Sequence, residues 1–318
     1  MLIAFPKERA AGEKRVAVTP ESIAKIQKLG HSVAVQSGAG IEAGFSDQAY
    51  LDAGAEVLAD AAAVWDRGDV VAKVEAPTEE ELKSLSANQS LISFFYPRQN
   101  EEALQTAKST GGTVIAMDMV PRISRAQKMD ALSSMANVAG YRAVVEAGNN
   151  FGRFFTGQVT AAGKIPPAKV LVIGAGVAGL ASIGTAVSLG AVVRAFDVRP
   201  EVAEQIVSMG AEFVFLDFED NQDGAATGGY AAPSSPEFRE KQLECFRALA
   251  PDTDIVISTA LIPGREAPKL WLEDMVQAMK PGSVVVDLAA PAGGNCDLTV
   301  PGERVVLENG VVIIGYTD

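Results

Sequence analysis

The sequence predicts an α/β protein of two domains, each with a mostly parallel sheet. Short β-branched segments alternate with apolar helical segments along nearly the whole chain, which is the pattern of strands wrapped by helices. A glycine-rich turn of defined spacing follows one strand and opens a helix. The length of 318 residues suits two domains that each have their own core.

The first domain is predicted over residues 1–128. Its first helix has a clear start, because Thr19 can cap it, Pro20 fits its first position and Glu21 lies in its first turn; Gly30 ends it. The segment 38–44 also contains three glycines, but the third comes one residue late for a nucleotide-binding loop, so we interpret it as a structural turn. Strands are expected at 2–5, 32–36, 69–74, 90–95 and 113–117, and helices at 20–29, 47–54, 78–86 and 99–110.

The second domain is predicted over residues 129–318. Residues 129–158 are expected to be helical, with a break near Gly148, and to link the two domains; residues 161–167 are expected to form a turn. A helix is expected at 177–189, and strands at 169–173, 191–196, 212–215, 254–258, 283–287, 304–307 and 311–315. The cleft between two such domains is the default place for a ligand.

One strand–loop–helix–strand segment of the second domain carries the strongest functional signal. Gly174 allows a tight turn, Gly176 leaves room for a pyrophosphate, and Gly179 lets the helix pack closely on the strand. Asp197 ends the next strand, about 20 residues later, where a carboxylate accepts hydrogen bonds from the adenosine ribose hydroxyls. Both domains are therefore predicted to be Rossmann-like, and the second to bind NAD(H) rather than NADP(H), although Arg199 could accommodate a 2′-phosphate.

The other cofactor-binding candidates lie beside these residues or in nearby loops. The long segment 217–235 shows no helix or strand pattern, so it is either a lid or a plain insertion. Tyr230 lies at its tip as a candidate stacking group. The full set adds Ala175, Val177, Val198, Gly229, Ala260 and Leu261.

Composition excludes several classes of protein. A net charge of −13 argues against binding nucleic acid or an anionic membrane surface, and no run approaches the roughly 18 apolar residues of a membrane span. Cys245 and Cys296 fit no disulfide or metal spacing, so no metal site is predicted and a reducing cytosol is expected. His31, the single histidine, is expected to be a turn residue, which leaves no catalytic histidine.

A polar segment at the predicted domain junction is a second candidate site. Gln127, Asp130 and either Ser133 or Ser134 recur at helical spacing and would share one helical face, with Arg122 preceding them. Such groups suit the carboxamide and ribose of a nicotinamide nucleotide. Helix capping and solvent exposure explain the same spacing equally well.

Several motifs together resemble the alanine dehydrogenase / nicotinamide nucleotide transhydrogenase family. They are Pro6–Glu8, Glu13–Pro20, the glycine-rich turn, Pro121–Ser134 and Asp287–Gly294. The resemblance is strongest to the NAD(H)-binding component of proton-translocating transhydrogenase. It implies that Arg122, Gln127, Asp130 and Ser133 hold the dihydronicotinamide and that the loop of Tyr230 closes on it.

The same resemblance implies partners and a location. It implies a homodimer that works with NADP(H)-binding and membrane-spanning subunits, in the cytoplasm at the inner membrane, without inserting itself into the membrane. Hydride would pass directly from NADH to NADP⁺ on a partner subunit. Family members usually continue beyond the position of Asp318, so we expect either that this is a truncated segment or that the remainder lies elsewhere.

Two alternatives stay open. A stand-alone alanine-type dehydrogenase would use Arg15 to hold a carboxylate and Lys73 as a base. However, Glu75 stands where alanine dehydrogenases carry a lysine, and the segment 93–96 lacks their catalytic histidine. Hydride exchange between two nicotinamides moves no proton at the reacting carbons and needs no such base. The other alternative is a non-catalytic NAD-binding protein.

Overall fold

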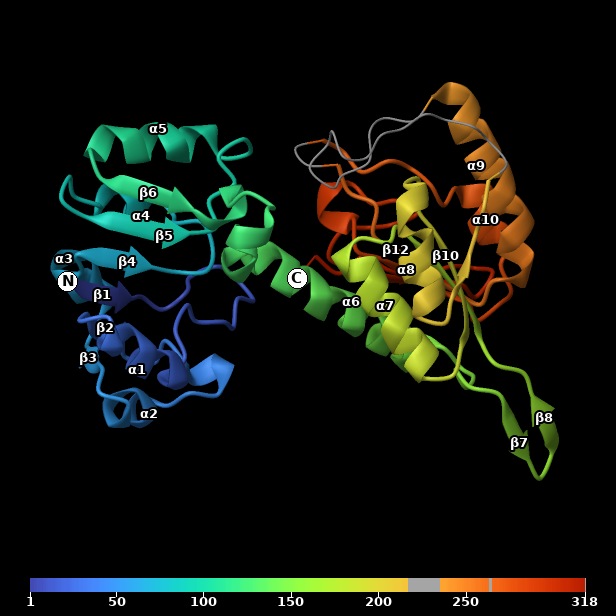
Figure 1. Ribbon diagram of the computed structural model, residues 1–318, viewed down its shortest axis with the longest axis horizontal. Helices are drawn as coiled ribbons and strands as arrows, with labels where there is room; N and C mark the ends of the chain where they lie inside the picture. The colour runs from blue at the N-terminus through green and yellow to red at the C-terminus, as the bar shows by residue number, and fades with distance from the viewer. Residues whose placement is uncertain (217–234, 263–264, 318) are drawn as a thin grey trace. The chain divides into compact units, whose positions relative to one another are not determined.

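The computed structural model describes residues 1–216, 235–262 and 265–317. It divides into two compact units, Met1–Ala131 and Leu132–Asp318, and each unit has a parallel or mainly parallel sheet with helices on both faces (Figure 1). The predicted fold class, α/β with mostly parallel sheets, is confirmed.

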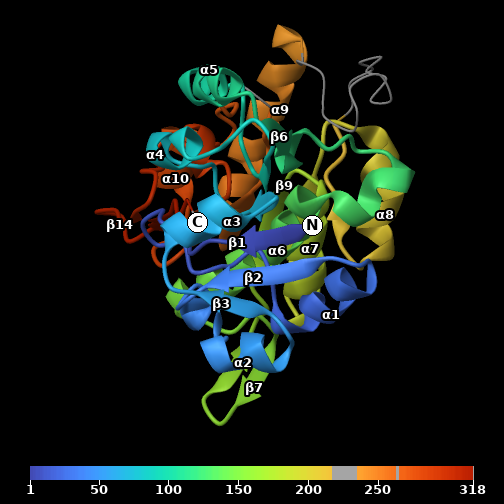
Figure 2. The same ribbon diagram turned by 90° about the vertical axis from the view of Figure 1, so that its left-hand side faces the viewer.

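The sheet of the first unit has six parallel strands in the order β3-β2-β1-β4-β5-β6. Figure 2 shows β1, β2 and β3 of this sheet side by side. The strands are β1 (Leu2–Phe5), β2 (Ser32–Gln36), β3 (Glu56–Leu58), β4 (Val70–Ala72), β5 (Ser90–Ser93) and β6 (Thr113–Ala116). The helices are α1 (Pro20–Lys28), α2 (Asp47–Asp52), α3 (Ala61–Arg67), α4 (Glu79–Lys83) and α5 (Glu101–Thr110), with short 3₁₀ helices η1 (Ile41–Ala43), η2 (Met117–Met119) and η3 (Ser124–Met129).

Two apolar clusters hold these helices to the two faces of the sheet. On one face Val64 of α3, Leu82 of α4 and Ala107 of α5 pack against strand residues. On the other face Ile23 of α1 and Tyr50 of α2 do the same. The segment 38–44 lies there as a turn, and a side chain at its central glycine would collide with the buried ring of Tyr50.

The sheet of the second unit has seven strands in the order β11-β10-β9-β12-β13-β15-β14, of which only β14 is antiparallel. Its strands are β9 (Lys169–Ile173), β10 (Val192–Phe196), β11 (Glu212–Phe213), β12 (Ile255–Ser258), β13 (Val284–Asp287), β14 (Arg304–Val306) and β15 (Val312–Ile314). The helices are α6 (Ala131–Asn150), α7 (Val177–Ser188), α8 (Ala203–Ser208), α9 (Pro236–Leu249) and α10 (Glu273–Ala278), with 3₁₀ helices η4 (Pro200–Val202), η6 (Ala250–Asp252) and η7 (Ala290–Ala292).

The order of the strands creates a switch point between β9 and β12. The chain leaves β9 toward β10 on one side and later adds β12 and β13 on the other. Helices α6, α7 and α8 share one apolar cluster with the sheet, and α9 and α10 share the other. In open parallel sheets, ligands bind beyond the carboxyl ends of the strands at such a point.

The structure corrects the predicted helix at 129–158. The helix α6 runs through Gly148 without a break and ends at Asn150. After it, β7 (Gln158–Thr160) and β8 (Gly163–Ile165) form an antiparallel hairpin, which extends away from the rest of the unit in Figure 1. The prediction failed because a hairpin of two three-residue strands is too short to show a period of two.

Five other elements were also absent from the prediction. They are the short elements β3, α3, α8 and α10 and the 14-residue helix α9, and two of them begin with a side-chain cap. Asp60 accepts a hydrogen bond from the Ala63 N–H (2.8 Å) at the start of α3, and Ser235 does the same for Phe238 (3.1 Å) at α9.

Candidate functional site

The three glycines after β9 have different steric surroundings. A Cβ at Gly179 would lie 1.8 Å from the carbonyl oxygen of Gly174, and a Cβ at Gly174, whose φ is +99°, would lie 2.6 Å from Oγ1 of Thr259. Both positions therefore need glycine for the fold itself. A Cβ at Gly176 would have no atom of the described residues within 4 Å. Packing within the described part of the chain therefore does not require glycine there, and the open space suits an external group that approaches the backbone.

Helix α7 begins at this open space without a capping side chain. Gly176 is its N-cap residue, and a glycine has no side chain to accept the first backbone N–H groups of the helix. By contrast, the N-cap residues Asp60 of α3 and Ser235 of α9 do accept such bonds. The N-terminus of α7 can therefore donate hydrogen bonds to an anion, which its helix dipole also attracts.

Asp197, directly after β10, faces the same loop and is almost fully hydrogen-bonded. Its Oδ2 accepts from the Ala175 N–H (2.7 Å) and from Nη2 of Arg199 (2.9 Å). Its Oδ1 accepts from the backbone N–H and from Nε of Arg199 (2.9 Å each). The hydrogen bond to Asp197 raises the pKa of Arg199. Since a carboxylate offers about four acceptor positions, a sugar diol would compete here with the guanidinium.

The segment after β12 forms the other side of the switch point. Thr259 donates its hydroxyl to the carbonyl oxygens of Ile173 and Gly174 (3.2 Å each), which ties this segment to the glycine-rich loop. The fully buried Asn295 holds Ala260 through two hydrogen bonds, one to the N–H (3.0 Å) and one to the carbonyl (2.9 Å). Leu261 is left 45% exposed beside them. The candidates Ala260 and Leu261 thus lie on a segment that side-chain hydrogen bonds hold in place, which we call the braced segment.

Asp287, at the end of β13, braces the same edge and was not singled out from the sequence. It is 1% exposed, and its carboxylate accepts from the Ser258 hydroxyl (3.0 Å), the Cys296 N–H (3.0 Å) and the Thr299 hydroxyl (2.7 Å). An acidic residue that ends a run of buried valines is the signal that could have identified it.

The polar segment 121–134 has a different local structure from the one predicted. Gln127 lies in the 3₁₀ helix η3, Asp130 is its non-helical C-cap residue (φ −78°, ψ 78°), and Ser133 lies in the first turn of α6. The expectation of one continuous helical face for Gln127, Asp130 and Ser133 or Ser134 is therefore wrong. Arg122, which precedes η3, is exposed.

The two groups required by the dehydrogenase alternative are both engaged by carboxylates. Nζ of Lys73 lies 2.8 Å from Glu81 and 3.7 Å from Glu8, and all three side chains are buried. Nη2 of Arg15 lies 2.5 Å from Glu13 and 3.0 Å from Glu75. Each of the two cations is thus held by carboxylates of the same chain.

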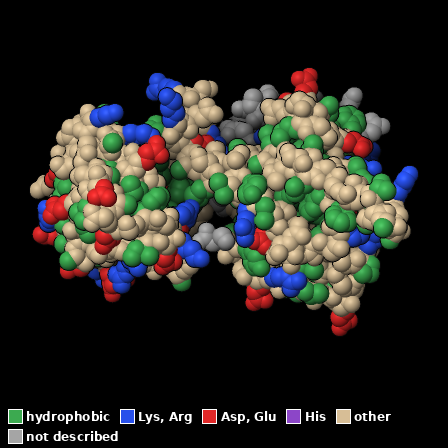
Figure 3. Space-filling model, turned by 90° about the horizontal axis from the view of Figure 1, so that it is seen from below, with side chains coloured by type: hydrophobic (Ala, Val, Ile, Leu, Met, Phe, Trp, Pro, Cys, Tyr) green, Lys and Arg blue, Asp and Glu red, His purple; other side chains and the backbone are tan. Residues whose placement is uncertain are grey.

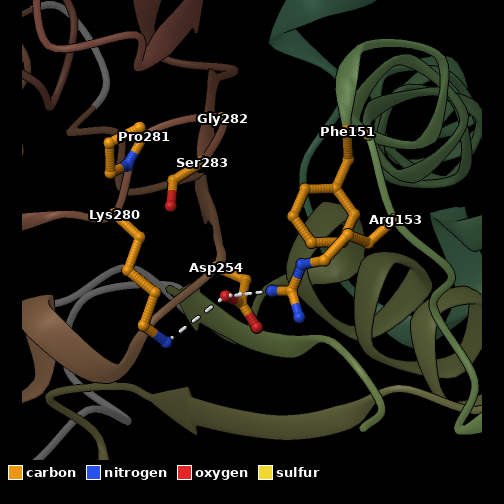
Figure 4. A pocket seen from close by; sticks show the side chains of 8 residues that line it. Phe151, Arg153, Asp254, Lys280, Pro281, Gly282 and Ser283 are labelled. Carbon is orange, nitrogen blue, oxygen red and sulfur yellow. Dashed lines mark hydrogen bonds and ion pairs between the residues drawn. The ribbon is translucent and has the colours of Figure 1, made fainter. Parts of the chain in front are cut away.

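A cavity of about 390 Å³ in the second unit lies at the amino ends of β12 and β13, away from the glycine-rich loop. Figure 4 shows Arg153 and Lys280 both directed at Asp254 in this cavity. Their nitrogens lie 2.5 Å and 3.5 Å from its Oδ1, and Asp254 also accepts the Lys169 N–H (2.9 Å). The two cations are thus partly neutralised by the protein, and the cavity is not our candidate site.

One face of the molecule shows how the surface charges of the described residues are distributed. On the face shown in Figure 3, acidic and basic side chains are interspersed over both units. Within the described ranges, no helix is long and apolar enough to cross a membrane. The sequence candidates Gly229 and Tyr230 lie outside the described residues.

Comparison with known proteins gives a consistent result along the whole chain. Residues 4–139 match the alanine dehydrogenase/PNT N-terminal domain, and residues 143–318 match the alanine dehydrogenase/PNT C-terminal domain. The chain is 70% identical, over its full length, to NAD(P) transhydrogenase subunit alpha of Cereibacter sphaeroides, of which it covers 61%. It therefore spans about three fifths of the length of that curated relative.

Solved structures show the same relationship. A transhydrogenase from Sinorhizobium meliloti superimposes with a TM-score of 0.88 at 41% identity, covering 100% of this chain and 86% of that one. An L-alanine dehydrogenase superimposes with a TM-score of 0.81 at 28% identity, covering 99% of this chain and 82% of that one.

Proposed function

The chain belongs to the alanine dehydrogenase/PNT family, and from this membership we propose that it is the NAD(H)-binding component of a proton-translocating NAD(P) transhydrogenase. The observation that carries the proposal is the loop after β9. There, two glycines are required by close backbone packing, whereas Gly176 faces open space at an uncapped helix N-terminus. A dinucleotide pyrophosphate is the group that such a loop accommodates.

The proposed cofactor contacts begin at this loop. The pyrophosphate lies against the loop residues Gly174, Ala175, Gly176, Val177 and Gly179. The adenosine end of the cofactor lies against the segment that follows β10, which comprises Asp197, Val198 and Arg199, and the ribose displaces the Arg199 guanidinium from Asp197. The braced segment with Ala260 and Leu261 borders the cofactor across the switch point. Gly229 and Tyr230, which lie outside the described residues, complete the proposed set of cofactor contacts.

Four further residues orient the nicotinamide. Arg122 and Gln127 supply hydrogen-bond donors for the carboxamide and ribose oxygens, whereas Asp130 and Ser133 supply acceptors. When bound, NADH supplies the hydride, which passes to NADP⁺ held by a partner subunit. The residues of this chain align the ring and keep water out, and neither role needs a general base.

The partners of this component are proposed from the same branch of the family. They are a second copy of the chain and the NADP(H)-binding and membrane-spanning subunits of the complex. Proton translocation takes place in those membrane-spanning subunits, so this component lies in the cytoplasm, at the inner membrane, through its partners.

The alternative functions predict different chemistry. An alanine-type dehydrogenase would need an available cation for a carboxylate and an available base, but Arg15 and Lys73 are both paired with carboxylates. A non-catalytic NAD-binding protein has the same glycine-rich loop, and only an assay of transfer separates it from the proposed function.

The test is hydride transfer from NADH to thio-NADP⁺ in the presence and absence of an isolated NADP(H)-binding transhydrogenase subunit. We expect reduction of the analogue only when both proteins are present. Gly176→Val, which fills the open space at the loop, is the matched control and should abolish transfer without unfolding the chain. NADH binding without transfer would refute the proposed reaction, and NADH oxidation with pyruvate and ammonia would identify a dehydrogenase instead.

A further inference from the structure

The side-chain amide of Asn295 joins two separate points of the chain inside the second unit. Asn295 is fully buried in the loop that follows η7. Its Oδ1 accepts from the Ala260 N–H (3.0 Å), and its Nδ2 donates to the carbonyl oxygens of Ala260 and Pro268 (2.9 Å each). Both amide hydrogens and the amide oxygen are therefore in use.

The backbone around Asn295 is fixed as well. Its carbonyl oxygen accepts from the N–H groups of Leu270 (2.8 Å) and Trp271 (3.0 Å). The next residue, Cys296, donates its N–H to the buried Asp287 (3.0 Å) at the end of β13. Breaking any of these buried bonds leaves a polar group without a partner, which is costly. The amide is therefore held at one place relative to the sheet.

The braced segment meets a ligand mainly with apolar side chains. Asn295 already bonds the N–H and the carbonyl of Ala260. The segment presents the half-buried side chain of Ala260 and the 45% exposed side chain of Leu261. Such a surface contributes by packing, and packing requires that its supporting hydrogen bonds hold it in the right place.

The braced segment lies at the carboxyl end of β12, across the switch point from Asp197. Strand β9 lies between β10, which leads to Asp197, and β12. A dinucleotide bound at a switch point extends over both halves of the sheet, with one mononucleotide on each. With the adenosine ribose at Asp197, the nicotinamide mononucleotide half begins on the β12 side.

We propose that Asn295 is a positioning residue for NAD(H), which acts through the braced segment on the nicotinamide mononucleotide half of the cofactor. Asn295 has no exposed surface with which to touch a ligand. It keeps Ala260 and Leu261 in place before the cofactor arrives, so that their ordering does not weaken binding. The proposal rests on the proposed function, since it assumes that the glycine-rich loop binds NAD(H).

The test compares ligands that share the adenosine half. 5′-AMP carries that half alone, whereas ADP-ribose adds a phosphate and a ribose on the β12 side. In Asn295→Ala we expect the Kd values for ADP-ribose and NADH to rise about three- to tenfold, the scale of ordering one loosened group on binding. The Kd for 5′-AMP should stay unchanged.

Asn309→Ala is the matched control. The amide of Asn309 also bonds in both directions, to the Val276 carbonyl and the Val311 N–H (3.1 Å each). However, Asn309 lies before the amino end of β15, at the opposite edge of the sheet. Its replacement should lower the melting temperature and leave the binding of all three ligands unchanged.

Asn295→Asp gives a readout that a general loss of packing would not move. A neutral carboxyl group donates and accepts hydrogen bonds, whereas a carboxylate only accepts and would face two carbonyl oxygens. Burial favours the neutral form, so lowering the pH from about 8 to about 6 should restore ADP-ribose affinity in this variant relative to the wild type. Asp287 and Lys269, which are hydrogen-bonded to the same loop, are present in both proteins.

Three results would overturn the proposal. They are equal losses of 5′-AMP and ADP-ribose affinity in Asn295→Ala, no loss of either, and the same pH dependence in Asn295→Asp as in the wild type. A wild-type chain that binds NADH without transferring hydride would refute the proposed reaction and leave these binding comparisons in force. A wild-type chain that binds neither NADH nor ADP-ribose would overturn both.

Discussion

Replacing Arg199 by Gln is expected to strengthen the binding of NADH. In the structure, the guanidinium of Arg199 occupies two of the four hydrogen-bonding positions on Asp197, and backbone N–H groups occupy the other two. The backbone bonds are fixed by the fold, so a ribose diol must displace the side-chain bonds. Arg199 is therefore an internal competitor of the cofactor.

The size of the effect follows from the geometry of this pair. A hydrogen bond to a charged group contributes about 1.5–3 kcal/mol when buried, and an exposed ion pair contributes about 0.2–1 kcal/mol. The side chains of Arg199 and Asp197 are 17% and 6% exposed, which lies between these limits. Displacing the guanidinium should then cost about 1–2 kcal/mol, so its removal should lower the Kd for NADH about 5- to 30-fold.

The same substitution, Arg199→Gln, should weaken the binding of NADPH. Without the guanidinium, the charge of Asp197 is no longer neutralised and repels a 2′-phosphate, which also loses its nearest cation. Fluorescence titration of Arg199→Gln with NADH and NADPH measures both effects. Arg194→Gln, which removes an arginine of β10 with 32% exposure, controls for the change in net charge. Weaker NADH binding by Arg199→Gln would refute the competition and show that Arg199 holds the bound cofactor.

Three further predictions concern the stability and reactivity of the chain. Gly176→Ala should melt like the wild type and bind NADH more weakly, whereas Gly179→Ala should lower the melting temperature strongly, because its Cβ would lie 1.8 Å from a carbonyl oxygen. Equal melting temperatures of the two variants in a thermal scan would contradict this. Hydrogen bonds from Arg15 hold the pKa of Glu13 below its usual value of 4.5, so the stabilisation from this ion pair is present above pH 4.5 and is lost on further acidification. In urea titrations, the free energy of unfolding of Glu13→Gln should therefore depend less on pH between pH 5 and pH 3. Burial raises the pKa of Cys296 to about 11, so a thiol reagent at pH 8 should label Cys245 first and Cys296 only after unfolding, as mass spectrometry would show.

The sequence was sufficient where the signal is local and repeated. The glycine spacing from Gly174 to Gly179, with buried strands on either side, predicted the loop, the following helix and Asp197 at the end of the next strand. These residues depend on each other over a short stretch of chain, and β9, α7 and β10 are found where they were expected. The parallel pairing of β9 with β10 follows from the helix that connects them.

The sequence was insufficient where tertiary contacts decide the structure. Spacing alone placed Gln127, Asp130 and Ser133 on one helix, but Asp130 adopts a non-helical conformation between η3 and α6. Tyr96 adopts a left-handed backbone conformation (φ 49°), and its only sequence signal is the proline that follows it, which argues for an extended residue. Its conformation depends on Asp118, which belongs to the segment after the neighbouring strand.

The charged residues show why candidate chemistry cannot be assigned from residue type alone. Arg15, Lys73 and Arg199 are each paired with a carboxylate of the same chain, so none of them is a ready-made site for an anionic substrate. The difference between them lies in what surrounds the pair. Lys73 is buried with its partners, whereas the partner of Arg199 also accepts the N–H of a residue in the glycine-rich loop, beside open space. A ligand that replaces the guanidinium there gains a fully oriented carboxylate, and this makes Asp197 the charged group best placed for binding.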